Sequence, residues 1–152
     1  MKIDLSGRKA VVTGSTAGIG RAIAEGLARA GAAVVINGRG QERVAAALRE
    51  LRELFPKGEF TGVSADLATP EGAAHLFAQA PDADILVNNV GTGRPKSFFE
   101  IGDSEWIDLF ELNVMSGNPR LAPLSAEHDE ARLGARRLHQ QRVRARSAQG
   151  HD

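Results

Sequence analysis

The sequence predicts an α/β fold with a doubly wound parallel sheet of about four strands. Over residues 1–117, short runs rich in valine, isoleucine and leucine alternate with longer segments of helical apolar periodicity. This alternation is typical of βαβ units, whose parallel strands are buried on both faces. The pattern ends near residue 117, and the tail beyond it has no aromatic residue. We therefore expect a partial α/β unit over 1–117, followed by an irregular or disordered tail over 118–152.

Four strands and four helices are expected in alternation. The strands are predicted at 9–13, 33–37, 60–64 and 84–88, and the helices at 18–30, 42–55, 70–80 and from about 104 toward 114. The third helix has the clearest start, because Thr69-Pro70-Glu71 combines a capping residue, an N1 proline and a first-turn acid. Asp103 or Ser104 is expected to cap the fourth helix. The apolar faces predicted for the first two helices are Ile19, Ile23, Leu27 and Ala30, and Val44, Leu48, Leu51 and Phe55.

A glycine-rich turn, T-G-S-T-A-G-I-G, directly follows the first strand. A strand that runs through such a turn into a helix gathers backbone N–H groups and the positive end of a helix dipole, which together suit a pyrophosphate. No Gly-Lys-Ser/Thr follows, so a P-loop is excluded. The spacing T-G-x3-G-x-G resembles that of the short-chain dehydrogenase/reductase family, although an isolated glycine motif can also be purely structural. The resemblance makes cofactor-binding candidates of Thr13, Gly14, Ser15, Thr16, Gly18, Ile19 and Gly20.

Three further segments match the same family in order, one after each remaining strand. They read Asn37-Gly38-Arg39, Asp66-Leu67 and Asn88-Asn89-Val90-Gly91, the last with valine where the family has alanine. The resemblance therefore covers most of residues 1–117 and implies a Rossmann-like nucleotide-binding fold. By the same resemblance, Asp66 bonds the adenine amino group, Asn88 ties neighbouring strands, and Asn89, Val90 and Gly91 border the cofactor ribose. Asp66 can also be an ordinary turn aspartate.

The segment after the second strand favours NADP over NAD. NAD-preferring Rossmann proteins place an acid near Asn37, where this chain has none. Arg39 follows instead, and a guanidinium suits a 2′-phosphate. Ala17 stands where many NADP-preferring members carry a second basic residue, so NAD binding stays possible. Arg39 can also be a solvated loop residue.

One catalytic residue of the family can be placed, and three cannot. Asn113 matches the family asparagine that holds a water near the active-site lysine. It shares a predicted helix face with Trp106, Leu109 and Phe110, where its amide needs hydrogen-bond partners, and it can also be a structural amide. The family's serine and its Tyr-x-x-x-Lys pair have no counterpart, and the chain has no tyrosine. We therefore expect the family's proton transfer not to run in this polypeptide.

The tail from Asn118 is expected to be translated in a shifted reading frame. When the possible codons of the tail are read one base later, they permit Met-Thr-Lys-Arg-Gly-Trp over 128–134 and Gly-Arg-Val-Val-Phe-Ile-Ser-Ser up to Arg142. That string resembles the family's next helix, fifth strand and catalytic serine. The alternative is a native Arg-rich tail that contacts nucleic acid, which its interspersed acids and lack of aromatic residues disfavour.

Composition excludes several other classes. Without cysteine there is no disulfide, thiol catalysis or thiolate metal site, and the four histidines have no metal-ligand spacing, so no metal is expected. No apolar stretch is long enough to span a membrane, and no secretory signal is visible, so we expect a cytoplasmic protein. We expect no nucleic-acid or membrane partner.

By resemblance, the leading interpretation is an NADP-dependent oxidoreductase that acts on a small carbonyl or alcohol substrate and is inactive in this form. The alternatives are a non-catalytic nucleotide-binding remnant and a cofactor-responsive interaction module. The fourth strand should form an open edge of the sheet, and the family's oligomer interface should be incomplete.

Overall fold

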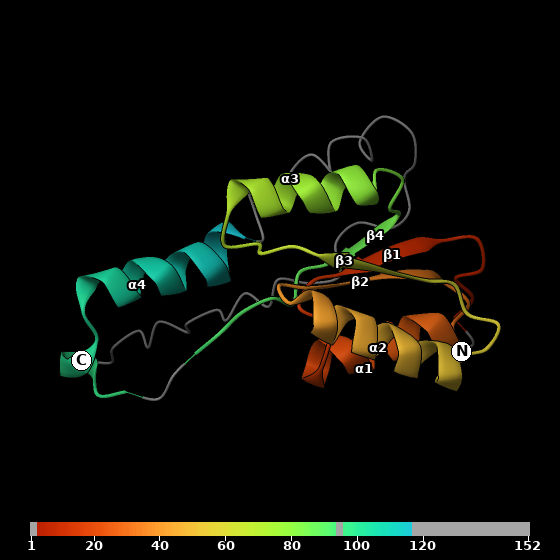
Figure 1. The fold of residues 1–152 in the computed structure, drawn as a ribbon, viewed down its shortest axis with the longest axis horizontal. Helices are drawn as coiled ribbons and strands as arrows, with labels where there is room; N and C mark the ends of the chain where they lie inside the picture. The colour runs from red at the N-terminus through yellow and green to blue at the C-terminus, as the bar shows by residue number, and fades with distance from the viewer. Residues whose placement is uncertain (1–2, 94–95, 117–152) are drawn as a thin grey trace, which may run out of the picture.

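The computed structural model describes residues 3–93 and 96–116, and it confirms the α/β fold. Four parallel strands form one sheet in the order β3-β2-β1-β4 (Figure 1). Their bounds are Lys9–Val12 for β1, Ala33–Gly38 for β2, Phe60–Ser64 for β3 and Ile85–Val87 for β4. Within the described residues, β4 pairs only with β1, so its other side is the predicted open edge. The predicted tail, 118–152, lies outside the described residues.

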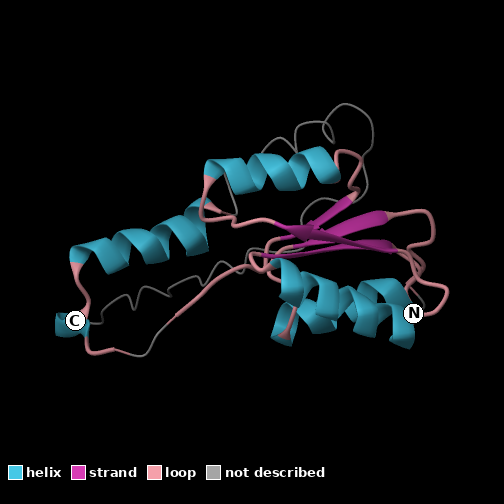
Figure 2. Cartoon of the chain, in the orientation of Figure 1, coloured by secondary structure: helices cyan, strands magenta, loops and turns pink. Residues whose placement is uncertain are grey.

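Helices cover both faces of the sheet. The helices α1 (Gly18–Arg29) and α2 (Gln41–Leu54) lie side by side on one face, and α3 (Pro70–Gln79) covers the other (Figure 2). After a short 3-10 turn, η1 (Phe98–Glu100), the helix α4 (Asp103–Phe110) continues into a π-helical turn, η2 (Glu111–Met115). α4 extends away from the sheet, at the left of Figure 1. The arrangement is doubly wound, as predicted.

The core has two layers, one on each face of the sheet. On the α3 face, Val11, Val35 and Val63 pack with Leu76. On the α1–α2 face, the buried residues are Ala10, Val12, Val34, Ile36, Ala24, Ala47 and Leu51, with Phe60 from the edge strand. Because successive strand residues point to opposite faces and both faces are covered, the strands read as continuous apolar runs in the sequence.

The predicted start of α3 is confirmed, and the predicted cap of α4 is wrong. Thr69 caps α3, since its Oγ1 accepts a hydrogen bond from the Gly72 N–H at 3.1 Å. Gly31, with a φ of 94°, follows the C-cap Ala30 at the end of α1. The cap of α4 is Gly102, which lacks a capping side chain. Asp103 and Ser104 instead begin the helix, where an acid still interacts well with the dipole.

The buried face of α1 also differs from the prediction. Ile19 is 76% exposed. Gly20 and Ala24 are the buried residues of this helix, while Ile23 and Leu27 pack at the margin of the core. Gly20 and Ala24 lie four residues apart, so they share the face of α1 that packs against the sheet. Ile19 precedes Gly20 by one residue and therefore lies on a different side of the helix, in solvent.

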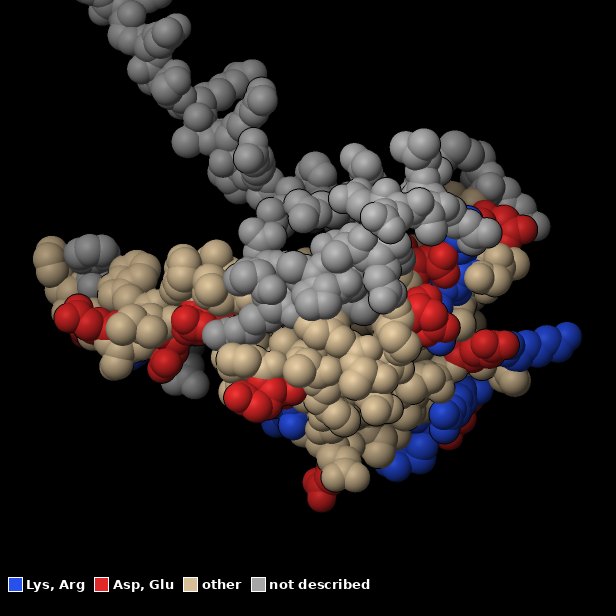
Figure 3. All heavy atoms as spheres, turned by 90° about the horizontal axis from the view of Figure 1, so that it is seen from above, with Lys and Arg blue, Asp and Glu red and all other residues tan. Residues whose placement is uncertain are grey.

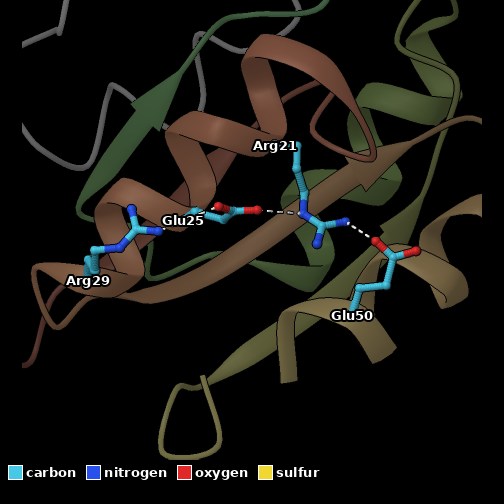
Figure 4. A network of polar contacts seen from close by, with 4 residues as sticks. All are labelled: Arg21, Glu25, Arg29 and Glu50. Carbon is cyan, nitrogen blue, oxygen red and sulfur yellow. Dashed lines mark hydrogen bonds and ion pairs between the residues drawn. The ribbon is translucent and has the colours of Figure 1, made fainter. Parts of the chain in front are cut away.

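A network of ion pairs joins α1 to α2 on their outer surface (Figure 4). The Arg21 guanidinium contacts Glu25 at 3.1 Å and Glu50 of α2 at 2.8 Å, and Arg29 lies 3.6 Å from Glu25. The Arg21 side chain is only 15% exposed, so solvent screens this network less than an ordinary surface pair. The network holds the two helices in a fixed relation beside the loops that follow β1 and β2.

Charged residues are distributed unevenly over the surface. Figure 3 shows acidic and basic side chains interspersed at the end opposite α4, and acidic side chains at the α4 end. Two pairs lie where β1 begins: Lys9 contacts Asp82 at 2.7 Å, and Arg8 contacts Asp84 at 2.8 Å. The hydrogen bond from Lys9 lowers the pKa of the exposed Asp82 carboxyl. These pairs fasten the start of β1 to the segment that precedes β4.

Candidate functional site

A cleft of about 810 Å³ lies at the carboxyl ends of the strands. Its walls come from the loops after all four strands and from α4. The four segments singled out in the sequence meet here, and their members that line the cleft are Gly14, Thr16, Asn37, Gly38, Arg39, Asp66, Leu67, Val90 and Gly91. The volume is in the range of small-molecule and cofactor sites, and the carboxyl edge of an open parallel sheet is where such sites occur.

The glycine-rich loop after β1 needs glycine for two distinct reasons. Gly14 and Gly18 have φ angles of 61° and 58°, the left-handed region that favours glycine. Gly20 is required by space, because a Cβ there would lie 2.5 Å from the Gly14 oxygen and 2.4 Å from Asn89 Nδ2. The loop therefore presses its backbone directly onto the segment after β4.

Thr13 and Asn89 tie the ends of β1 and β4 together. The buried Thr13 hydroxyl accepts hydrogen bonds from the backbone N–H groups of Asn89 and Val90, both at 2.9 Å, and donates to the Val87 carbonyl at 3.3 Å. In return, Asn89 Nδ2 donates to the carbonyls of Thr13 and Gly14 at 2.9 and 3.1 Å. Asn89 thus ties the ends of β1 and β4 together, and the neighbouring Asn88 is exposed.

Asn37 points into the protein, beneath the cleft. It is 1% exposed. Its Nδ2 donates to the carbonyls of Val63 and Ala65 at 3.2 and 3.1 Å, and its Oδ1 accepts from the Gly14 N–H at 3.3 Å. The buried Ser15 hydroxyl accepts from the Asn37 N–H at 3.0 Å and donates to the Val12 carbonyl at 2.6 Å. Asn37 and Ser15 therefore set the position of the loop.

Arg39 lies on the cleft wall with its side chain exposed. Among the described residues it has no ion-pair or hydrogen-bond partner for its guanidinium. The preceding Gly38 leaves room for Thr16, whose methyl group would be 2.6 Å from a Cβ at that position. The Arg39 guanidinium therefore has no counter-ion among the described residues, and the Gly38 backbone before it packs closely against Thr16 of the glycine loop.

Asp66 and Leu67 face different ways. Leu67 is 2% exposed and belongs to the core under α3, although it also borders the cleft. The exposed Asp66 forms an Asx turn, in which Oδ1 accepts from the Ala68 N–H at 3.0 Å, and its carbonyl accepts from Thr69 Oγ1 at 3.0 Å. The turn fixes the carboxylate at the cleft wall.

Asn113 fastens the last helix to the segment after β4. Its Oδ1 accepts from the Thr92 N–H, and its Nδ2 donates to the carbonyls of Thr92 and Leu109, all at 2.9 Å. The Asn113 side-chain amide thus has the hydrogen-bond partners that its predicted position required. The predicted apolar face is not buried, however, since Trp106 and Phe110 are 47% and 53% exposed. The π-helical turn that begins at Glu111 changes the angular step, so the i, i+7 relation to Asn113 no longer holds.

Sequence reasoning missed several residues that line the cleft. They are Gly38, Gly40, Arg43, Ala68, Thr92 and Lys96, together with Ser104, Glu105, Asp108, Leu109, Glu111 and Leu112 from α4 and its continuation. Arg43 carried no local signal, because Arg39 precedes the N-cap Gly40 and the i, i+4 relation holds only within a helix. The α4 residues carried none, since their contribution depends on where that helix lies.

The residues present could hold a phosphorylated nucleotide. α1 begins directly after the loop that contributes Gly14 and Thr16 to the cleft wall. Its N-cap, Ala17, has no capping side chain, so its first-turn N–H groups are available to an anion. Within residues 3–93 and 96–116, no group of three potential metal ligands occurs. None of the described helices is long and apolar enough to cross a membrane.

The chain matches known oxidoreductases over its first three-quarters. The family model described as short chain dehydrogenase matches residues 8–118. The chain is 49% identical over 117 residues to the uncharacterized oxidoreductase YvaG of Bacillus subtilis, covering 77% of this chain and 44% of the relative. It is 38% identical over 118 residues to the 3-oxoacyl-[acyl-carrier-protein] reductase FabG of Aquifex aeolicus, covering 75% of this chain and 47% of the relative.

A solved relative carries the same fold. The crystal structure of L-sorbose reductase from Gluconobacter frateurii, complexed with NADPH and L-sorbose, matches with a TM-score of 0.75 and 42% identity. The match covers 82% of this chain and 48% of that one. This chain thus spans about half the length of the relatives it matches. From the family match over residues 8–118 and these relatives, the chain belongs to the short-chain dehydrogenase family.

Proposed function

We propose that this chain supplies the NADP-binding portion of a short-chain oxidoreductase that interconverts a carbonyl and an alcohol. The observation that carries the proposal is the unpaired Arg39 guanidinium on the cleft wall beside the glycine loop. A guanidinium gives a 2′-phosphate two parallel charge-assisted hydrogen bonds. Two solved relatives support the choice of cofactor, since L-sorbose reductase was solved with NADPH and RhlG of Pseudomonas aeruginosa, at 36% identity, with NADP.

Each predicted site residue has a proposed role. The N–H groups of the loop from Gly14 to Gly20 and of the first turn of α1 hold the pyrophosphate, and Asp66 accepts from the adenine amino group. Val90 and Gly91 border the ribose, while Thr13, Ser15, Asn37 and Asn89 position these segments from beneath. Asn113 positions the Thr92 backbone. The nicotinamide supplies or accepts the hydride when the cofactor is bound.

These 152 residues contain no tyrosine to protonate a substrate oxygen. We therefore propose that they bind the nucleotide without turnover, and that catalysis needs a serine and a Tyr-x-x-x-Lys pair. The second candidate function is a non-catalytic nucleotide-binding module. It is favoured by the same missing tyrosine.

Calorimetric titration with NADPH and NADH tests the proposal. We expect saturable binding of both, with NADPH about tenfold tighter, and a smaller preference in Arg39→Ala. Arg49→Ala is the matched control, because Arg49 is an exposed arginine of α2 outside the cleft. Oxidation of NADPH with a panel of carbonyl compounds, L-sorbose included, should stay at background. Absence of binding would reject the proposed function, and turnover above background would reject the requirement for tyrosine.

We also propose that residues 118–152 are translated out of frame. The family match, which ends at residue 118, supports this. Resequencing the gene from codon 113 through the region downstream tests it. We expect the alternative frame to continue into a serine and a Tyr-x-x-x-Lys segment. A stop codon in that frame, or loss of the family pattern, would show that the tail is native and would favour the non-catalytic module.

A further inference from the structure

Two arginines, not one, stand on the cleft wall beside the glycine loop. Arg39 follows β2, and Arg43 lies in the first turn of α2. Both are exposed, and among the described residues neither has a hydrogen-bond or ion-pair partner for its guanidinium. This contrasts with Arg21, Arg29 and Arg8, which are all paired with carboxylates.

The position of Arg43 is electrostatically unfavourable without a ligand. A cation in the first turn of a helix opposes the helix dipole. The positions three and four residues away are Arg39, Gly40, Ala46 and Ala47, so no acid is placed to pair with Arg43 along the helix. Arg39, which precedes the N-cap Gly40, adds a second positive charge to the same cleft wall. A bound dianion would interact favourably with both charges.

Gly40, the N-cap of α2, lies beside the Arg43 side chain and also lines the cleft. A Cβ at Gly40 would lie 4.0 Å from the Arg43 Cγ, which places the stem of Arg43 over the residue that caps α2. Gly40 has no side chain to cap the helix, so the first-turn N–H groups of α2 receive no side-chain cap from it.

We propose that Arg43 is a second ligand of the 2′-phosphate and that it forms a two-arginine clamp with Arg39. The inference rests on the proposed function, since it assumes that a 2′-phosphorylated adenosine occupies the cleft. Under this proposal, the second positive charge at the phosphate comes from Arg43 of α2, because Ala17 in the glycine loop is uncharged. Arg43 contributes to the discrimination between phosphorylated and unphosphorylated ribose, and it has no part in hydride transfer.

Calorimetry with 2′,5′-ADP and 5′-AMP tests the clamp, because the two probes differ only in the 2′-phosphate. The wild-type protein should prefer 2′,5′-ADP. Arg43→Ala should weaken 2′,5′-ADP binding roughly fivefold to tenfold and leave 5′-AMP binding within about twofold. Its Tm should be unchanged or higher, since alanine removes a charge that opposes the dipole. Arg49→Ala should change neither affinity.

The outcomes separate the clamp from the proposed function. If Arg39→Ala abolishes the preference and Arg43→Ala behaves like Arg49→Ala, the clamp is wrong and the NADP assignment stands. If the wild-type protein binds 5′-AMP and 2′,5′-ADP with equal affinity, the NADP assignment is wrong, and the clamp is then wrong too. Equal weakening of both probes by Arg43→Ala would show a general loss of the cleft, and it too would overturn the clamp.

Discussion

Replacing Asn37 by aspartate is expected to lower the free energy of unfolding by roughly 3–5 kcal/mol. The two side chains have the same shape, so the effect isolates one amide group. In the wild-type protein, Nδ2 donates to the carbonyls of Val63 and Ala65. An aspartate would turn a carboxylate oxygen toward those two oxygens in a buried site.

Urea denaturation measures this loss as a fall in the midpoint at constant slope. Gln41→Glu is the matched control, because it makes the same amide-to-carboxylate change at an exposed residue. Gln41 begins α2, where an acid interacts favourably with the dipole, so that variant should be neutral or slightly stabilised. Equal stabilities for the two variants would contradict a structural role for Asn37. The Asn37 variant should also bind NADPH more weakly, because Gly14 loses the partner that fixes its N–H.

Replacing Gly20 by alanine is the second change with a large expected effect, a loss of roughly 2–4 kcal/mol. The added methyl would stand between the Gly14 oxygen and Asn89 Nδ2, at 2.5 and 2.4 Å, inside a hydrogen bond that joins those atoms at 3.1 Å. It would also lie 2.9 Å from the Ser15 Cα. Because two of these three contacts are backbone atoms, the loop itself must move.

Gly26→Ala gives the opposite result on the same helix. A Cβ at Gly26 meets nothing within 4 Å, and alanine is the better helix former. This variant should gain about 0.5–1 kcal/mol in thermal or chemical denaturation. Calorimetry should find NADPH binding unchanged in Gly26→Ala and weakened at least about tenfold in Gly20→Ala. A Gly20→Ala protein with wild-type stability and affinity would show that the close contact between the loop and Asn89 is dispensable.

The strands and the first three helices could be predicted from the sequence because each depends on local pattern. Parallel strands buried on both faces read as continuous apolar runs, and Gly31 and Thr69 mark a helix end and a helix start in ways that need no tertiary information. The last helix could not be predicted as well. Its N-cap and the π-helical turn at Glu111 depend on which backbone N–H and C=O groups form hydrogen bonds in the folded protein. The residue types in this segment are compatible with several helix starts and hydrogen-bond patterns.

The positions of the site segments could be predicted, but not the direction of every side chain. Asn37 was predicted at the cofactor because it stands where NAD-preferring Rossmann proteins place an acid. It does line the cleft, but the sequence could not show that its amide is directed toward the carbonyls of Val63 and Ala65. Arg43 was overlooked because a lone arginine on an amphipathic helix usually belongs to a solvated face. Its position on the cleft wall depends on where α2 begins, which only the packing of the loop after β2 determines.

The clasp between Thr13 and Asn89 has a consequence for amide hydrogen exchange. The amides of Asn89 and Val90 lie beyond the end of β4, where a loop would ordinarily exchange its protons with solvent quickly. Both donate to the buried Thr13 hydroxyl, so their release requires β1 and β4 to separate. The protection of these two amides against exchange should therefore resemble that of the Val87 amide. Although both lie outside the sheet, their exchange should report its opening. A nucleotide bound against Val90 and Gly91 would slow the same opening, so the exchange rates of these two amides would report its binding although both N–H groups donate to Thr13.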